Sequence, residues 1–518
     1  MNLTKISGIS IVLLLCTTLL QAQQRPAEPA KPKPEAPATK TESKESGNLV
    51  FNPDQAVTTS HEVTIKGSRF PYKATAGTMP VWDEEGKTIA GLFYTYYERS
   101  DVKDRSMRPL VISFNGGPGS ASVWMHIAYT GPVLLNIDDE GYPVQPYGYK
   151  ENPYSILDVA DIVFVDPVNT GYSRMMSKDG PRSKFFGVNA DIKYLAEWIN
   201  TFVTRNNRWA SPKFLIGESY GTTRVSGLAL ELQESQWMYF NGVVLVSPTD
   251  LGIERGAPLD AALRLPYFAA TAWYHKKLPA DLQQKDLDAM LPEVENFTMN
   301  ELVPAINKGG LIAAAERKAI VAKMARYSGI SETVISQNNL DVSTNLFWKE
   351  LLRDSGYTVG RLDSRYKGVD LRDAGDRPDY NSELTSWLHS FTPPINMYLR
   401  QELNYKTDFK YNLFGPVHPW DQSNNHTGRD LGDAMRMNPY LNVMVQSGYF
   451  DGACDYFNAK YNMWQIDPTG KLKDRMSFQG YRSGHMMYLR REDLQSSNEH
   501  IREFIKKSVL KPGTPARF

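Results

Sequence analysis

Residues 213–234, KFLIGESYGTTRVSGLALELQE, contain the pattern that decides the fold. The apolar run at the start predicts a buried strand, and residues 222–234 predict a helix. Between them, residues 217–221 match G-x-S-x-G, which occurs only once in the chain. Where this motif joins a strand to a helix, the sharp turn lifts its serine above the edge of a sheet. Ser219 is therefore the predicted nucleophile, and the alternative is a glycine-rich turn whose serine is incidental.

Apolar runs of the same kind recur on both sides of this motif. They are PLVISF, DIVFVD, GVVLVS and LNVMVQSG, and such short continuous runs suit strands buried on both faces of a parallel sheet. Helical stretches such as residues 192–205 lie between several of them. The alternation predicts an α/β fold with a mostly parallel central sheet and helices on both faces. Residues 61–97, rich in β-branched and aromatic side chains, predict a β-meander before it.

The alternation of strands and helices stops between residues 251 and 438, a helix-rich and aromatic stretch. Strand-like runs resume at Leu441, so we expect an insertion in preference to a separate domain. The predicted core comprises residues 49–250 and 439–518, and residues 251–438 form a predicted helical cap. An aromatic-rich cap could cover the site or supply the surface of a homodimer.

The N-terminal part of the chain predicts an export signal and a tether. Residues 1–22 combine a positive charge, a short apolar segment and Ala22 as a cleavage position, the pattern of a signal peptide. Cys16 would suit a lipoprotein anchor, but the bulky Leu15 before it disfavours lipidation. Residues 23–48, rich in Pro, Ala, Lys and Glu, predict a disordered linker. We expect a periplasmic or secreted protein without an integral membrane span.

Composition excludes several classes of protein. The 58 Lys and Arg residues balance 58 Asp and Glu residues, so the formal net charge is zero, which argues against a dedicated nucleic-acid binder. Two cysteines, Cys16 and Cys454, are too few for a disulfide scaffold or an iron–sulfur protein. No H-E-x-x-H or similar cluster appears, so we expect neither a metal nor another cofactor.

A serine nucleophile needs a base, and the base follows the serine in chains with this kind of elbow. Six of the eight histidines come after Ser219. His485, in the loop SGHMMY behind a strand-like run, is the predicted base. His500 lies on the predicted C-terminal helix, and His418 and His426 lie in the polar end of the insertion.

An acid must orient the base. Asp451 follows LNVMVQSGYF, at the carboxyl end of a predicted strand, where catalytic groups of α/β folds gather. Asp451 is therefore the predicted acid. Asp455 is its nearest rival, and the alternative for Asp451 is a residue that caps a turn.

A second glycine-rich loop follows another core strand, in SFNGGPGS at residues 113–120. Consecutive glycines let backbone N–H groups approach a reacting carbonyl, and the N–H after the serine could join them in an oxyanion hole. The alternatives are a phosphate-binding loop and a plain turn. Neither G-x-G-x-x-G nor a Walker A motif is formed, which disfavours phosphate.

Four blocks of the sequence together resemble the serine carboxypeptidases, the family of carboxypeptidase Y and cathepsin A. The blocks are FNGGPGSAS, NPYSILDVADIVFVDPVNTGYS, IGESYG, and SGYFDGACDY with GHMMY, in family order over about residues 109–488. The resemblance implies an α/β-hydrolase fold and removal of C-terminal residues from peptides, often at acidic pH. With the predicted signal peptide and the few cysteines, it implies an exported bacterial member.

The resemblance also implies roles for individual residues. It implies a catalytic triad of Ser219, Asp451 and His485. It implies that Gly117 and the backbone N–H of Tyr220 are the oxyanion donors. It also implies that the side chains of Asn115 and Glu218 bind the substrate's terminal carboxylate. Glu218 would act in its protonated form, which requires a raised pKa and favours acidic conditions.

The chain departs from the family pattern at several positions. Ser120 stands where the family usually has a disulfide-bonded cysteine, and Thr222 replaces the last glycine of GESYGG. Tyr129 stands where a second carboxylate-binding glutamate is expected. The negative charge that would help to raise the pKa of Glu218 is therefore absent. Cys454 matches a family cysteine near the acid, and we interpret it as a packing residue.

The sequence therefore predicts an exported serine carboxypeptidase whose partners are peptide substrates. An esterase or acyltransferase that uses the same triad is the first alternative. A non-catalytic envelope binding protein that kept the fold is the second.

Overall fold

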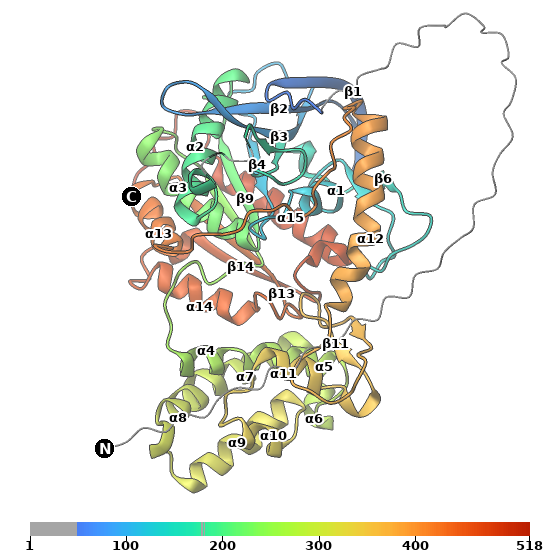
Figure 1. Cartoon of the computed structure of the whole chain (residues 1–518). Coiled ribbons are helices and arrows are strands. Elements are labelled where there is room, and N and C mark those ends of the chain that lie inside the picture. The colour runs from blue at the N-terminus through green and yellow to red at the C-terminus, as the bar shows by residue number, and fades with distance from the viewer. Residues whose placement is uncertain (1–48, 178–179, 181) are drawn as a thin grey trace, which may run out of the picture. The chain divides into compact units, whose positions relative to one another are not determined.

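The computed structural model describes residues 49–177, 180 and 182–518 (Figure 1). The predicted signal peptide and linker, residues 1–22 and 23–48, lie outside the described residues. Within the described part of the chain, no helix is long and apolar enough to cross a lipid bilayer.

A ten-stranded sheet organises the chain, in the order β1-β2-β3-β7-β4-β9-β10-β13-β14, with β8 beside β3. The pairs from β1 to β7 are antiparallel, whereas all pairs from β7 to β14 are parallel. The strands are β1 (Gln55–Ile65), β2 (Ser68–Trp82), β3 (Thr88–Arg99), β4 (Leu110–Phe114), β7 (Asp161–Val165), β8 (Arg174–Met175), β9 (Lys213–Glu218), β10 (Gly242–Val246), β13 (Asn442–Gly448) and β14 (Met476–Tyr481). The predicted α/β fold, with a meander before a mostly parallel sheet, is confirmed.

Both faces of the parallel strands are covered, which explains why these strands are almost continuously apolar. On β9, Phe214 and Ile216 face one apolar cluster, and Leu215 faces the other. On β10, Val244 faces the first cluster and Val243 faces the second. Burying each such side chain contributes about 1.5–3 kcal/mol. The covering helices are α1 (Val123–Ala128), α12 (Ser382–Met397) and α15 (Arg491–Ser508) on the first face, and α2 (Val188–Arg205), α3 (Tyr220–Ser235) and α13 (Thr427–Met437) on the second.

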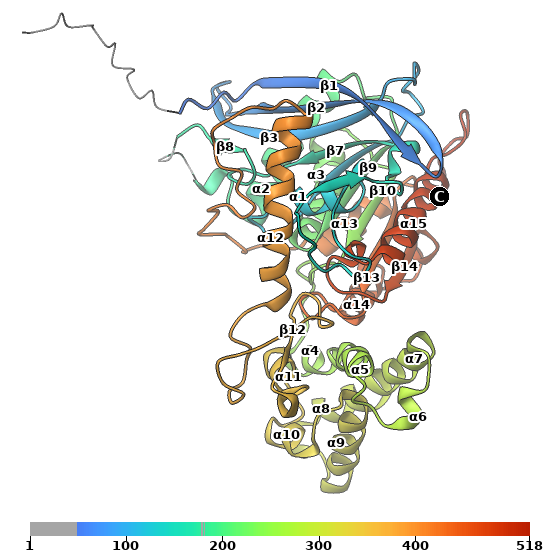
Figure 2. The same ribbon diagram turned by 90° about the vertical axis from the view of Figure 1, so that its right-hand side faces the viewer.

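The long helical stretch after β10 has an apolar core of its own. Its helices are α4 (Ala257–Leu263), α5 (Leu265–Tyr274), α6 (Ala280–Gln283), α7 (Leu287–Phe297), α8 (Val303–Asn307), α9 (Ala314–Ser328), α10 (Glu332–Gln337) and α11 (Thr344–Glu350). In Figures 1 and 2 they lie together below β13 and α14 (Tyr456–Ile466). Phe450, Tyr456 and Phe457 join their cluster, so this core is continuous with the loops that follow β13.

The rest of the predicted cap behaves differently, because α12 runs along the sheet domain (Figure 2). Phe391 of α12 packs against Trp124 of α1, with ring centroids 4.4 Å apart. Further along, the Ala121 N–H donates to the Leu413 carbonyl, and the Gly415 N–H donates to Gly119. Residues 251–438 thus comprise helices with their own core and a segment that covers the sheet domain. Two small hairpins, β5–β6 (Val133–Leu135, Tyr149–Glu151) and β11–β12 (Thr358–Val359, Lys367–Gly368), complete the strands.

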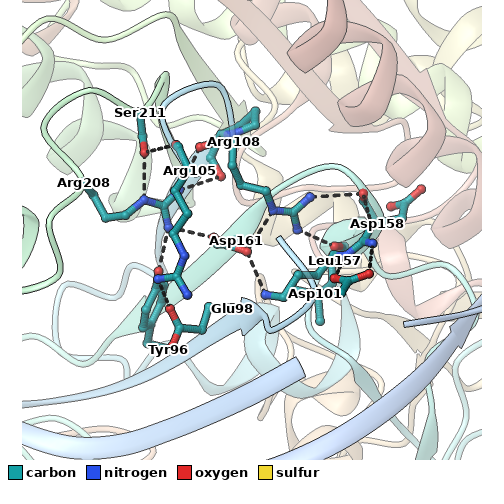
Figure 3. Close-up of polar contacts among 12 residues, drawn as sticks. Tyr96, Glu98, Asp101, Arg105, Arg108, Leu157, Asp158, Asp161, Arg208 and Ser211 are labelled. Atoms are coloured by element: carbon teal, nitrogen blue, oxygen red, sulfur yellow. Dashed lines mark hydrogen bonds and ion pairs between the residues drawn. The ribbon is translucent and has the colours of Figure 1, made fainter. Parts of the chain in front are cut away.

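A buried ion network fastens the edge of the sheet at which β4, β7 and β9 begin (Figure 3). Asp161, the first residue of β7, accepts hydrogen bonds from Arg108 Nε at 3.0 Å and from Arg208 Nη1 at 2.7 Å. The exposed fraction of the three side chains is at most 8%. Arg208 also donates to the Tyr96 hydroxyl, at 2.6 Å, and so ties the meander to the parallel strands.

Candidate active site

Ser219 lies at the apex of a strand–turn–helix elbow between β9 and α3. Its backbone has φ +57° and ψ −128°, a strained conformation for a residue with a side chain. The elbow is held by the Ser219 N–H, which donates to the Val246 carbonyl at 3.0 Å. It also needs Gly217, because a Cβ there would lie 2.1 Å from the Gly221 carbonyl oxygen. The turn presents Ser219 at the carboxyl edge of the sheet, partly exposed.

Asp451 and His485 form a buried pair behind two neighbouring strands, β13 and β14. His485 Nδ1 lies 2.7 Å from Asp451 Oδ2. The other carboxylate oxygen accepts the backbone N–H groups of Ala453 and Cys454, at 2.9 and 3.0 Å. Burial alone would lower the pKa of His485, but the Asp451 charge and hydrogen bond outweigh it and raise that pKa well above its ordinary value. Asp451 thus fixes the ring and stabilises its protonated form.

The rival residues lie in other settings. Asp455 caps α14, where its carboxylate accepts the Asn458 N–H at 2.9 Å. His500, on α15, lies 2.8 Å from the Tyr481 hydroxyl. His418 and His426 are exposed. Among these residues, Asp451 and His485 form a buried carboxylate–imidazole pair, and their service to Ser219 stays a prediction.

One group of three potential metal ligands lies together among the described residues. Its members are Asp451, Cys454 and His485, whose ligand atoms lie within 4.8 Å of one another. The Asp451–His485 hydrogen bond already occupies two of these groups. Burial raises the pKa of the Cys454 thiol, which disfavours the thiolate that a metal would bind. The group fits acid–base chemistry better than metal binding.

The NGGPG loop after β4 lies directly against the elbow. A Cβ at Gly116 would lie 2.4 Å from the Tyr220 backbone nitrogen and 2.7 Å from the Glu218 carbonyl oxygen, so only glycine fits there. Gly117 follows with φ +104°, a conformation that favours glycine. This close approach brings the loop to the backbone N–H of Tyr220, the predicted oxyanion donor.

Asn115 and Glu218, the two predicted carboxylate-binding residues, are in contact. Asn115 Nδ2 donates to Glu218 Oε1 at 2.9 Å, and the Met125 N–H donates to Asn115 Oδ1 at 3.1 Å. Glu218 is 3% exposed. Burial raises the pKa of its carboxyl to about 7. A carboxyl that can hold a proton near neutral pH thus immediately precedes Ser219.

Sequence reasoning missed three groups that hold this site in place. The first is Tyr488, whose hydroxyl donates to Glu218; its place in the GHMMY block was the only available signal. The second is Arg224 of α3, whose guanidinium donates to the carbonyls of Asn115 at 2.6 Å and Pro118 at 3.2 Å. Asp191 of α2 anchors Arg224 at 2.6 Å.

The third missed group is residues 361–364, a strap from the predicted cap. The His485 N–H donates to the Leu362 carbonyl at 2.7 Å, and the Gly452 N–H donates to Arg361 at 3.0 Å. The buried carboxylate of Glu383 accepts the Leu362 N–H at 2.8 Å and fixes the strap to α12. One segment thus braces both the acid loop and the base loop.

A cleft of about 1420 Å³ opens beside the elbow, between the sheet domain and α4. Its lining includes Tyr220 and Thr249 from the sheet side, Arg255 before α4, and Cys454 from the acid loop. A cleft of this size exceeds the usual 300–1,000 Å³ of small-molecule sites. It has room for several residues of an extended chain.

The mostly parallel sheet, the strand–turn–helix elbow and the Asp451–His485 pair at its carboxyl edge form an α/β-hydrolase fold. Residues 65–249 match the family model described as serine carboxypeptidase.

Curated relatives are similar over part of the chain. Serine carboxypeptidase-like 36 of Arabidopsis thaliana is 28% identical over 165 residues, 31% of this chain and 32% of that protein. Carboxypeptidase Y of Schizosaccharomyces pombe is 29% identical over 231 residues, 42% of this chain and 20% of that protein. The chain thus spans a third or less of the length of these two relatives.

Among solved structures, the chain is similar to Kex1(Δ)p, a prohormone-processing carboxypeptidase from Saccharomyces cerevisiae. The TM-score is 0.49 at 14% identity, over 84% of this chain and 91% of that one.

Proposed function

We propose that this chain is an exported serine carboxypeptidase that removes C-terminal residues from peptides. The observation that carries the proposal is the buried Asn115–Glu218 pair directly before Ser219, with its hydrogen bond of 2.9 Å. An esterase needs only the elbow, the base and the oxyanion donors. A neutral carboxyl beside an amide supplies, in addition, two donors for the terminal carboxylate of a peptide.

The reaction proceeds through an acyl-enzyme. Ser219 attacks the scissile carbonyl and passes its proton to His485, while Asp451, 2.7 Å from Nδ1, keeps the imidazole in the productive tautomer. The oxyanion accepts hydrogen bonds from the backbone N–H groups of Gly117 and Tyr220. The protonated His485 then gives its proton to the leaving amine, so the C-terminal residue departs. A water molecule, deprotonated by His485, hydrolyses the ester on Ser219 and restores the serine hydroxyl.

Glu218 sets the pH range of this binding. Below a pH of about 7 it holds a proton and donates it in a hydrogen bond to the substrate carboxylate. Above that pH it is ionised and repels a carboxylate. We expect the affinity for a free C-terminus to fall as the pH rises through this range.

A matched pair of substrates tests the proposal. At pH 6, kcat/KM for an N-blocked dipeptide with a free C-terminus should exceed that of its C-terminal amide by about 10- to 100-fold, the value of charge-assisted hydrogen bonds that the amide cannot make. The ratio should fall between pH 6 and pH 8.5. Steady-state kinetics on both peptides, over this pH range, measures it.

The Glu218→Gln variant is the control, because glutamine keeps a neutral donor and cannot ionise. It should retain the preference for the free acid at pH 8.5. Hydrolysis of esters with both peptides untouched would contradict the proposal and favour the esterase or acyltransferase. Absence of any hydrolysis would favour the binding protein.

The remaining assignments extend this proposal. Residues 1–22 direct export to the periplasm or the exterior, and residues 23–48 tether the catalytic part. Residues 49–250 and 439–518 form the core, and residues 251–438 form the cap, whose helices border the cleft beside the elbow. The cap surface is also the candidate for a homodimer contact. The substrates are peptides of the envelope or the surroundings.

A further inference from the structure

The Glu218 carboxyl receives hydrogen bonds from two distant parts of the chain. Asn115, from the loop after β4, donates to one oxygen at 2.9 Å. The Tyr488 hydroxyl, three residues beyond His485, donates to the other oxygen. Tyr488 is 1% exposed, so no solvent competes for this bond. Both oxygens of the carboxyl are therefore engaged before a substrate arrives.

A second tyrosine holds Tyr488 in this position. The rings of Tyr129 and Tyr488 stack with centroids 4.5 Å apart and an interplanar angle of 13°. The Tyr129 hydroxyl turns elsewhere and donates to Gln446 Oε1 at 2.6 Å. Gln446 in turn donates to the Ser497 carbonyl at 3.1 Å. The two phenols thus share one stack, but only the hydroxyl of Tyr488 reaches Glu218.

We propose that Tyr488 is a specificity-determining residue: its hydroxyl orients Glu218 and sets the upper pH at which Glu218 can receive a peptide's terminal carboxylate. This inference rests on the proposed function of the Asn115–Glu218 pair. Tyr488 is a positioning residue in this scheme, because it acts on the substrate through Glu218.

The direction of its effect follows from the hydrogen bond. A hydroxyl that donates to a carboxyl favours the ionised form of that carboxyl. Burial is the largest influence and raises the pKa of Glu218, and the Tyr488 and Asn115 hydrogen bonds lower it. Two further charged groups face Glu218: His485 lowers its pKa and Asp451 raises it. Tyr129 also faces it, as a neutral phenol whose own pKa burial raises.

Substrate binding works against this hydrogen bond. A terminal carboxylate brings a second negative charge to Glu218, so Glu218 must take up or keep a proton. Tyr488 opposes that proton and therefore lowers the pH at which binding fails. The same hydrogen bond holds the Glu218 carboxyl in one orientation, so its position for binding the substrate carboxylate is fixed in advance.

The test uses two variants of the stacked pair. Tyr488→Phe keeps the ring and removes the donor, so the alkaline limb of kcat/KM for an N-blocked dipeptide should move up by about 0.5–1 pH unit, the equivalent of one hydrogen bond. The change should appear in KM and not in kcat. Tyr129→Phe, which removes a hydroxyl that does not touch Glu218, should leave the limb in place.

A third variant keeps the shape of the side chain. Site-specific replacement of Tyr488 with 3-fluorotyrosine makes the phenol a stronger donor and should move the same limb down. The ethyl ester of the dipeptide has no free carboxylate, and its alkaline limb should respond to none of the three variants. If Tyr488→Phe does not fold, the 3-fluorotyrosine variant still tests the proposal.

The outcomes separate the two levels of inference. If the wild-type protein prefers free acids and the limb does not respond to either Tyr488 variant, the role of Tyr488 is wrong and the proposed function stands. Equal shifts for the dipeptide and its ester would mean that the effect does not depend on the substrate's carboxylate, and would overturn the inference. Hydrolysis of esters alone by the wild type would overturn both.

Discussion

Replacement of Ser219 with alanine is expected to lower kcat for peptide and ester substrates by about 10⁴- to 10⁶-fold, the loss typical of a missing serine nucleophile. The elbow holds this residue at φ +57° above the carboxyl edge of the sheet. Ser247 also has a positive φ, +46°, after the buried strand β10, but it is fully buried and its hydroxyl donates to the His485 carbonyl at 2.8 Å. Single-turnover and steady-state kinetics on an N-blocked dipeptide ester measure the loss.

The variant should keep its fold and its substrate affinity, because alanine removes one oxygen from a partly exposed position. Ser235→Ala, at the exposed end of the same helix α3, is the matched control and should retain full activity. Residual activity of Ser219→Ala within 100-fold of the wild type would mean that the nucleophile is another group.

Replacement of Asp161 with asparagine is expected to lower the free energy of unfolding by about 3–5 kcal/mol, the cost of breaking a buried ion pair by removing one partner. Asp161 is the anion that Arg108 and Arg208 share, at 3.0 and 2.7 Å (Figure 3). Asparagine can accept from one guanidinium but leaves two buried cations without a counter-charge. Guanidinium denaturation of both proteins, followed by circular dichroism, measures the difference.

Glu301→Gln is the control for this prediction. Glu301 pairs with Lys323, and both side chains are 45% exposed, so the loss should stay within about 1 kcal/mol. If Asp161→Asn cost no more than this control, the network at the edge of β4, β7 and β9 would not contribute to stability as described.

The sheet and the elbow could be predicted because their signals are local. A short apolar run closed by a glycine motif, such as Phe214–Ile216 before Gly217, predicts a buried strand such as β9 without reference to the rest of the chain. Asp451 and His485 could be proposed because each follows a strand-like run. The order of serine, acid and base then restricts the choice further.

The supports of the site could not be predicted, because each depends on contacts between distant residues. Tyr488 meets Glu218 across 270 positions, and Arg224 meets Asn115 across 109. The strap at residues 361–364 lies in a segment with little regular structure, where the pattern of apolar residues carries no signal. The position of α12 along the sheet domain could not be predicted either, because the sequence of an amphipathic helix does not show which surface its apolar face covers.

We propose that Ser219 is a nucleophile activated by His485 and Asp451. Reaction of the folded protein with a serine-directed fluorophosphonate, followed by peptide mapping by mass spectrometry, tests this assignment. We expect one adduct, on Ser219, formed at a rate that falls at least 100-fold in His485→Ala. No adduct in the folded protein, or an adduct on another residue, would contradict it.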